Sequence, residues 1–180
     1  VGRGVGRIMS MVTYADVIAK YYPELKFVSY GSGTVYEQLI INSSQTLPSK
    51  EDLDDKLLTL RQEVMWRKIQ VERDRRRLTG GYKVGPYWFH SDDTSRIQQI
   101  ALTMMGASMP AGIMWKTMTK EMAPMTPTLA QQIFQTAASS DMTIFAIAEQ
   151  HKRQMYQLAN PETYNYLTGT PAWPKTFGEL

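Results

Sequence analysis

The pattern of hydrophobic and polar residues begins with a short helix and two strand-like runs. Residues 13–22 show the spacing of an amphipathic helix, and Pro23 ends it. Residues 26–30 and 34–41 are β-prone, and the Gly-Ser-Gly turn between them predicts a hairpin. We therefore expect a small N-terminal module of one helix and one hairpin over residues 11–48.

A long helix is predicted to follow over residues 49–79, with acidic residues in its first turn and arginines in its last. A seam with 4-3-4 spacing runs along this helix, which is the pattern of a coiled coil. The apolar members of the seam include Leu53, Leu57, Leu60, Val64 and Val71. One interpretation is an oligomer interface, in which copies of the chain pack through this seam. The other is an amphipathic helix that packs on its own domain.

A pair of glycines marks the end of this helix and the start of an aromatic hairpin. Gly80 stands where a helix end often needs a residue with positive φ. Residues 82–90 alternate around a Gly-Pro turn, which predicts two short strands. Asp92 or Asp93 can cap the next helix, expected over residues 94–106. The apolar face of that helix carries Ile97, Ile100, Ala101 and Met104.

The pattern further downstream predicts a second hairpin and two more helices. Residues 113–118 and 122–125 are the expected strands. Thr126 caps a helix with Pro127 at its first position, and a new helix is expected to start at Ser140 or Asp141. The first of these helices is expected to bury Leu129, Ile133, Phe134 and Ala137.

Together these elements predict an α+β fold divided into five segments. Residues 1–10 form a Gly-rich leader that we expect to be unstructured. The small N-terminal module and the long helix come next. A mainly helical domain with two short β-hairpins then covers residues 80–158, and an aromatic tail covers residues 159–180. Within this plan we expect residues 65–157 to fold on their own.

Composition and charge exclude several kinds of partner. The formal net charge is +3, and the leader contributes two of these charges, so the remainder carries 3 − 2 = +1. A nearly neutral body gives no general case for nucleic-acid binding. The arginine cluster at residues 73–77 is expected from the helix dipole alone. The absence of Cys excludes disulfides and thiolate metal sites, and no apolar run is long enough to predict a membrane span.

Few residues of the sequence are candidates for catalysis or metal binding. His90 stands beside Asp92 and Asp93, but zinc would need further ligands at suitable spacing, and His151 is the only other histidine. The sequence has no Gly-x-Ser-x-Gly elbow, HExxH pair or phosphate-binding loop. We therefore predict a protein that is not an enzyme, with no catalytic, cofactor-binding or metal-binding residues.

Aromatic and methionine residues are the remaining candidates for a binding surface. Aromatic side chains at hairpin ends often anchor interfaces. The candidates for contact with a partner are Trp88, Phe89, Trp173 and Phe177. Seven methionines lie between Met104 and Met125, and they either form an adaptable binding surface or fill the core.

Several blocks of the chain resemble an uncharacterised domain family of bacteriophage tail gene clusters, domain of unknown function 4376. The blocks GGYKVG, WFHSD and SRIQQ stand at residues 80–85, 88–92 and 95–99, and the resemblance covers about residues 65–157. One departure is Lys120-Glu121, where the family pattern has a tight Asp-Gly or Asn-Gly turn. Residues 14–60 show a weaker similarity to small proteins of prophage tail operons.

The resemblance implies a non-enzymatic structural component of a bacteriophage tail, at or near the tail fibre or baseplate. Such a protein would act by protein–protein assembly, in the host cytoplasm and then in the virion tail. Its partners would be other phage tail proteins and further copies of this chain, with a trimer favoured. The alternative is a tail-fibre assembly chaperone absent from the mature virion. A third class, an enzyme acting on host-surface glycans, normally needs paired carboxylates in a cleft.

Overall fold

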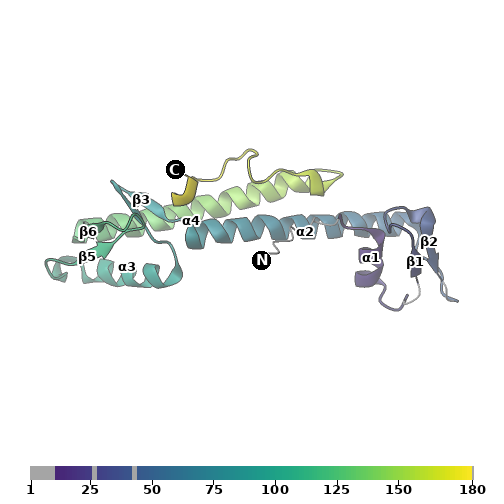
Figure 1. Ribbon diagram of the computed structural model, residues 1–180, viewed down its shortest axis with the longest axis horizontal. Helices are drawn as coiled ribbons and strands as arrows, with labels where there is room; N and C mark the ends of the chain where they lie inside the picture. Colours follow the sequence, from purple (N-terminus) through teal and green to yellow (C-terminus); the bar gives the residue numbers. More distant parts are fainter. Residues whose placement is uncertain (1–10, 26–27, 42–43, 180) are drawn as a thin grey trace, which may run out of the picture. The chain divides into compact units, whose positions relative to one another are not determined.

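The computed structural model describes residues 11–25, 28–41 and 44–179, so the predicted leader at residues 1–10 lies outside the described part. The chain forms two compact units (Figure 1). The first unit comprises Val1–Trp66 and Met155–Tyr164, and the second comprises Arg67–Gln154 and Asn165–Leu180. Two long helices contribute residues to both units.

The first unit contains the predicted helix and hairpin. Its elements are α1 (Tyr14–Tyr21), β1 (Val28–Tyr30), the 3-10 helix η1 (Tyr36–Gln38), β2 (Leu39–Ile41), the start of α2 (Lys50–Thr79) and the 3-10 helix η3 (Pro161–Thr163). Strands β1 and β2 pair antiparallel, with Val28 opposite Ile41. The backbone N–H of Thr13 donates to the Asp16 carboxylate at 2.8 Å, which satisfies a free donor at the start of α1.

The first part of the long-helix seam is buried in this unit. Leu53 and Leu57 belong to a core formed with α1 and β2, and Leu60 and Val64 pack against it. Because Leu53 and Leu57 are buried, a second copy of the chain cannot contact them. Val71 lies in the second unit and is 65% exposed. From Leu53 to Val64 the seam therefore packs within its own unit, because the small N-terminal module covers it. This agrees with the second interpretation, an amphipathic helix that packs on its own domain.

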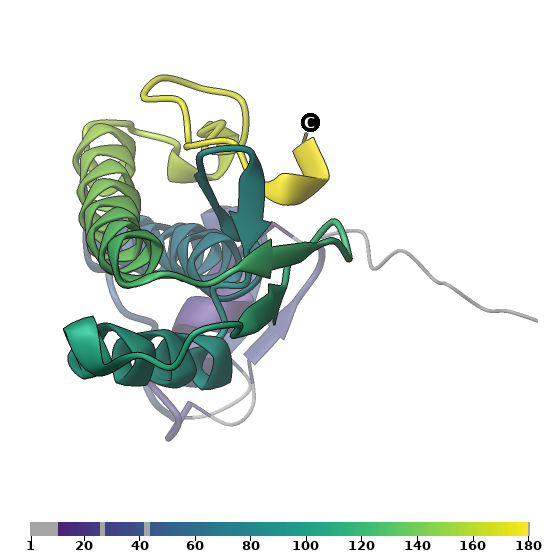
Figure 2. The same ribbon diagram turned by 90° about the vertical axis from the view of Figure 1, so that its left-hand side faces the viewer.

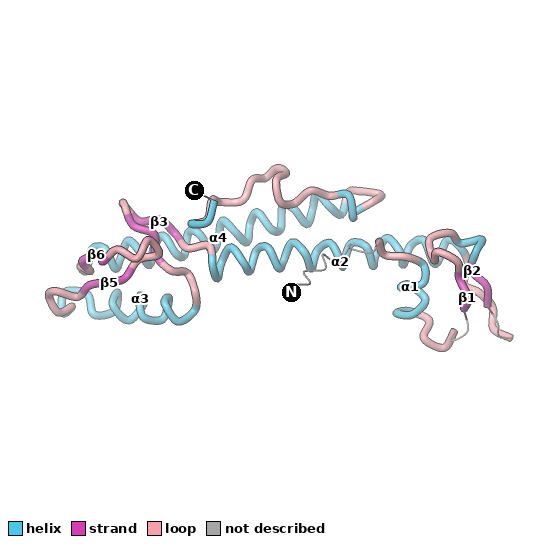
Figure 3. Tube along the Cα trace, viewed as in Figure 1, coloured by secondary structure: helices cyan, strands magenta, loops and turns pink. Residues whose placement is uncertain are grey.

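The second unit contains both remaining hairpins and most of the helical residues (Figure 3). Its elements are β3 (Tyr82–Val84), β4 (Tyr87–Phe89), α3 (Asp93–Met105), the 3-10 helix η2 (Gly106–Ser108), β5 (Met114–Lys116), β6 (Met122–Pro124), α4 (Pro127–Tyr156) and the 3-10 helix η4 (Phe177–Glu179). Tyr82 pairs with Phe89, and Trp115 pairs with Ala123. The α+β, mainly helical fold class is therefore confirmed.

The core of the second unit lies between the hairpins and the first half of α4. Its buried side chains are Tyr82, Val84, Phe89, Ala123, Met125, Ala130, Ile133 and Ala137. The Met118 backbone N–H donates to the Trp88 carbonyl at 2.9 Å and joins the two hairpins. Lys120 takes φ +68° in the turn between β5 and β6, a conformation that is uncommon for residues other than Gly, Asn and Asp.

The long helix α2 ends at Thr79, as predicted, but two other expectations about helix ends are wrong. Gly80 was expected to have positive φ, but it is Gly81 that has φ +68°. Residues 127–156 form one helix, so no helix starts at Ser140 or Asp141. No Gly or Pro interrupts this stretch, and Asp141 is held by an ion pair within the unit. The segment therefore continues as a helix, although Ser and Asp favour helix starts.

The C-terminal tail is docked on the second unit from residue 165 onward. The Arg76 guanidinium donates to the Pro174 carbonyl at 2.7 Å, and the Phe177 N–H donates to the Gly80 carbonyl at 2.8 Å. Trp173 and Thr176 are buried as a result. The tail thus closes over the end of α2 within its own unit.

Candidate interaction surface

The four aromatic residues predicted to contact a partner are used inside the second unit instead. Trp88, Phe89 and Trp173 are buried, and the rings of Trp88 and Phe177 meet edge to face at 5.9 Å. Trp173 packs on His151 with ring centroids 5.0 Å apart, and its Nε1–H donates to the Tyr166 carbonyl. These side chains hold the C-terminal tail and the β3–β4 hairpin in place. Because the rings of Trp88, Phe89 and Trp173 are buried, they are not available to contact a partner.

Asp92, one of the two residues predicted to cap α3, caps the start of this helix. The Ser95 backbone N–H donates to the Asp92 carboxylate at 2.9 Å, and the Ser95 hydroxyl donates at 2.7 Å. The backbone hydrogen bond from Ser95 is the main reason that the pKa of Asp92 lies below its ordinary value. The cap sets where the helix begins but not which face turns inward.

The inner face of α3 is mostly polar, with Leu102 as the apolar side chain that packs against the core. The Arg96 guanidinium donates to both oxygens of Asp141 on α4, at 2.6 and 2.8 Å, and to the Ser91 carbonyl at 2.7 Å. The Thr103 hydroxyl lies 3.1 Å from the Ala130 carbonyl, again on α4. These bonds attach α3 to the unit through polar side chains.

Gln99 completes this inner face and is only 3% exposed. Its amide donates to the His90 carbonyl at 3.1 Å and its oxygen accepts from the Tyr82 hydroxyl. Burial raises the pKa of Tyr82 to about 12, so the phenol stays neutral and donates. A buried polar side chain is tolerated because each of its groups is hydrogen-bonded.

The opposite face of α3 is apolar and points to solvent. The α3 apolar face, defined as Ile97, Ile100, Ala101 and Met104, is the face that the sequence pattern identified. Ile97 is 68% exposed, Ile100 43% and Met104 82%. Figure 2 shows α3 beside the first half of α4, where Phe134, expected to be buried, is 42% exposed. Apart from Leu102, the side chains that α3 turns toward the unit are polar, and its apolar side is exposed.

A groove lies between α3 and α4 next to this face. It has a volume of about 210 Å³. Its walls are formed by Arg96, Gln99, Ile100, Phe134, Ala137, Ala138 and Asp141. Sequence reasoning missed this site, although a signal existed: the polar residues Asp92, Arg96, Gln99 and Thr103 repeat at 4-3-4 spacing along one side of the helix.

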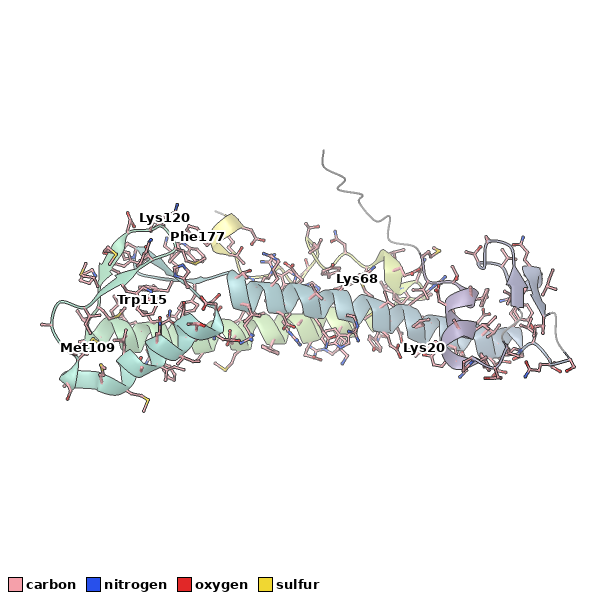
Figure 4. All side chains as sticks on the ribbon, turned by 60° about the horizontal axis from the view of Figure 1, so that its bottom comes forward. Lys20, Lys68, Met109, Trp115, Lys120 and Phe177 are labelled. Atoms are coloured by element: carbon pink, nitrogen blue, oxygen red, sulfur yellow. The ribbon has the colours of Figure 1, made fainter. Side chains whose placement is uncertain are left out.

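Two long stretches of sequence around this groove carry no charged residue. Residues 97–115 and 122–140 contain no Asp, Glu, Lys or Arg, and half of the 12 methionines of the chain lie here. Figure 4 shows Met109 and Trp115 in this part of the unit, with Lys120 at the turn between the two uncharged stretches. Depletion of charge and enrichment in Met and aromatic residues are typical of the centre of protein interfaces.

The arginine cluster at the end of α2 is occupied by carboxylates. Arg75 and Arg76 both bind Glu72, and Arg76 also binds Glu179 at 2.8 Å. The hydrogen bond from Arg75 is the largest cause of the lowered pKa of Glu72. The cluster is therefore an intramolecular network rather than a free anion-binding patch.

Other candidate chemistry is not assembled in the described residues. His90 contributes its carbonyl to Gln99 and lines a second groove with Ser95, Gln98 and Trp115. In the part of the chain that the structure describes, no three His, Asp or Glu side chains come together as metal ligands. Among the same residues, no helix combines the length and apolar character that crossing a membrane requires.

Comparison with known proteins identifies a family but no individual relative. Neither the curated proteins nor the solved structures contain a match to the chain. One family model does match, described as Domain of unknown function (DUF4376), and it covers residues 60–168. This match includes the end of α2, both hairpins of the second unit, α3 and α4. Because it spans more than half of the sequence, the chain belongs to the DUF4376 family.

Proposed function

We propose that the protein is a non-enzymatic structural component of a bacteriophage tail, at or near the tail fibre or baseplate, which acts through protein–protein assembly. The observation that carries the assembly role is the α3 apolar face, because a helix held by polar contacts leaves its apolar side for something else to cover. The phage setting comes from the sequence resemblance. Its partners would be other tail proteins, first in the host cytoplasm and then in the virion.

The grooves support a role without catalysis. One groove, of about 520 Å³, lies beside the β3–β4 hairpin and is lined by Lys83, Lys175, Trp88 and several hydroxyl and amide side chains, without a carboxylate. The groove beside α3 contains one carboxylate, Asp141, and Arg96 neutralises it. A glycan hydrolase normally needs two carboxylates facing each other across a cleft. These grooves of the described residues do not supply that pair.

A second candidate function is a tail-fibre assembly chaperone that leaves before the virion matures. The methionine-rich uncharged surface favours it, because flexible Met side chains adapt to several partners. Quantitative mass spectrometry of purified virions separates the two roles. A fixed number of copies per virion supports the structural component. Its absence from virions, with the protein still bound to tail-fibre protein in infected cells, supports the chaperone and overturns the component.

A further inference from the structure

The groove beside the β3–β4 hairpin has the size and the chemistry of a ligand site. We propose that it binds a sugar that carries an acidic group, either a phosphate or a carboxylate. This site goes beyond the proposed assembly role and does not depend on it. The volume of the groove, about 520 Å³, lies within the range of about 300–1,000 Å³ that sites for small molecules usually have.

Three segments that are distant in sequence form this groove. The β3–β4 hairpin contributes Lys83 and Trp88, α4 contributes a row of polar side chains, and the C-terminal tail contributes Pro174 and Lys175. Lys83 and Trp88 are cross-strand partners, so their side chains lie on the same side of the hairpin. The tail is held by the hydrogen bond from Arg76 to the Pro174 carbonyl, directly before Lys175. The second lysine therefore reaches the groove because the tail is docked.

The charge in the groove is positive and is not compensated there. The lining includes Lys83 and Lys175 but no Asp or Glu. Arg75, Arg76 and Arg96 of the same unit each bind a carboxylate. Among the residues that the structure describes, by contrast, Lys83 and Lys175 form no ion pair, and both are exposed. Two free ammonium groups in one groove favour a ligand with phosphate or carboxylate oxygens, which accept strong hydrogen bonds from a charged donor.

The polar side chains of α4 suit the hydroxyl groups of a sugar. Gln135, Ser139 and Thr143 recur every four residues, so they lie on one side of the helix. Within the described residues, the Gln135 amide and the Ser139 hydroxyl make no hydrogen bond, and the Thr143 hydroxyl donates to the Ser139 carbonyl at 2.9 Å. Amide and hydroxyl groups both donate and accept, as sugar hydroxyls do. A ligand held by its acidic group at the lysines would therefore find hydrogen-bond partners along α4.

Two other classes of anionic partner fit this groove less well. Every exposed side chain of its lining is polar or basic, and the aromatic residues Tyr82 and Trp88 are 3% and 7% exposed. A protein partner gains most of its affinity from buried aromatic anchors, for which the groove offers little exposed ring surface. A nucleic acid needs many phosphate contacts. The groove has two lysines, and residues 122–140 add no Lys or Arg.

Isothermal titration calorimetry of the full-length protein tests the site. The probes are the 6-phosphates and the uronates of glucose, galactose and mannose. At least one of them should bind, and the matching neutral sugar and inorganic phosphate should each bind at least about tenfold more weakly. The tightest probe identifies the acidic group. The proposal is overturned if none of the six binds at about 10 mM, or if the neutral sugar, inorganic phosphate, a polyglutamate peptide or a single-stranded oligonucleotide binds as tightly as the best probe.

Variants of the two lysines place the ligand in this groove. Lys83→Ala and Lys175→Ala should each weaken binding of the best probe by at least about tenfold, with circular dichroism and thermal melt unchanged because both side chains are exposed. Lys120→Ala is the matched control, because Lys120 is exposed in the turn between β5 and β6 and does not line the groove. Its affinity should equal that of the wild type. An equal loss in all three variants, or a loss in none, overturns the proposal.

Discussion

Arg96 on α3 and Asp141 on α4 form a two-bond ion pair, with nitrogen–oxygen distances of 2.6 and 2.8 Å across 45 positions of sequence. The pair fixes the rotation of α3 about its axis. Ile97 and Met104 lie about a quarter turn around the helix from Arg96, and they are 68% and 82% exposed. The exposed apolar face is thus a consequence of one polar contact and its neighbours.

Asp141→Ala should lower the free energy of unfolding by about 1–3 kcal/mol, because the partly buried Arg96 guanidinium loses its anionic partner. Asp93→Ala is the control. Asp93 is 69% exposed and meets Arg77 at 3.5 Å, so its loss should cost less than about 1 kcal/mol. Urea unfolding of both variants measures the difference. Equal losses would mean that the Arg96 pair does not hold α3.

The neutral, buried phenol of Tyr82 predicts a loss of stability at high pH. Its pKa is raised to about 12 in the folded protein, against about 10 in an unfolded chain. The stability that the neutral Tyr82 phenol contributes is therefore fully present below pH 10. It falls as the pH rises toward 12, since the unfolded state releases the proton first. Tyr82→Phe should lose less stability than the wild type between pH 9 and 11. Denaturant unfolding at several pH values measures this. If the free energy of unfolding changes equally with pH for the two proteins, the assignment to Tyr82 is contradicted.

His151 predicts the opposite dependence, on the acid side. It is completely buried against Trp173, and burial lowers its pKa below the ordinary value near 6.5. The stability that neutral His151 gives the folded protein is present above pH 6.5 and is lost as the pH falls, because the unfolded chain takes up the proton first. Thermal melts at pH 7 and pH 5 should differ more for the wild type than for His151→Phe. Equal differences for the two proteins would contradict the assignment to His151.

The sequence allowed the elements of the second unit to be predicted better than their orientation. Spacing placed Ile97, Ile100 and Met104 on one face, and the structure has that face. Periodicity, however, says which residues share a face and not which face the fold covers. That choice depends on Asp141, which is distant in sequence and was assigned to a helix start. The buried Gln99 and the groove could therefore not be located from local pattern.

The same limit applies to the long helix. The seam from Leu53 to Val64 was recognised, but its partner could be a second copy or the N-terminal module. The module supplies Val17 and Ile18 from α1, and these bury the seam. Such contacts between distant segments are set by tertiary packing. The predicted trimer stays a prediction, and the surface proposed here for association is a different one.

The end of α2 gives a further prediction, at the glycine that has positive φ. Gly81→Ala should destabilise by more than Gly85→Ala. Both residues have positive φ, +68° and +58°, so both lose about 1 kcal/mol of backbone preference. An added Cβ at Gly81 would lie 2.2 Å from the Met118 sulfur, whereas the space around Gly85 is open. Equal melting temperatures for the two variants would show that Met118 moves aside without cost.

The docked tail changes what can fold alone. Residues 65–157 were expected to be sufficient, but they omit Trp173 and Glu179, which cover His151 and bind Arg76. Without the tail, the Arg76 guanidinium, now 6% exposed at its side chain, would keep only Glu72. We therefore expect a fragment of residues 67–180 to melt cooperatively and residues 65–157 to melt broadly at lower temperature. Calorimetry of the two fragments decides, and coincident sharp transitions would mean that the tail adds nothing to the stability of the second unit.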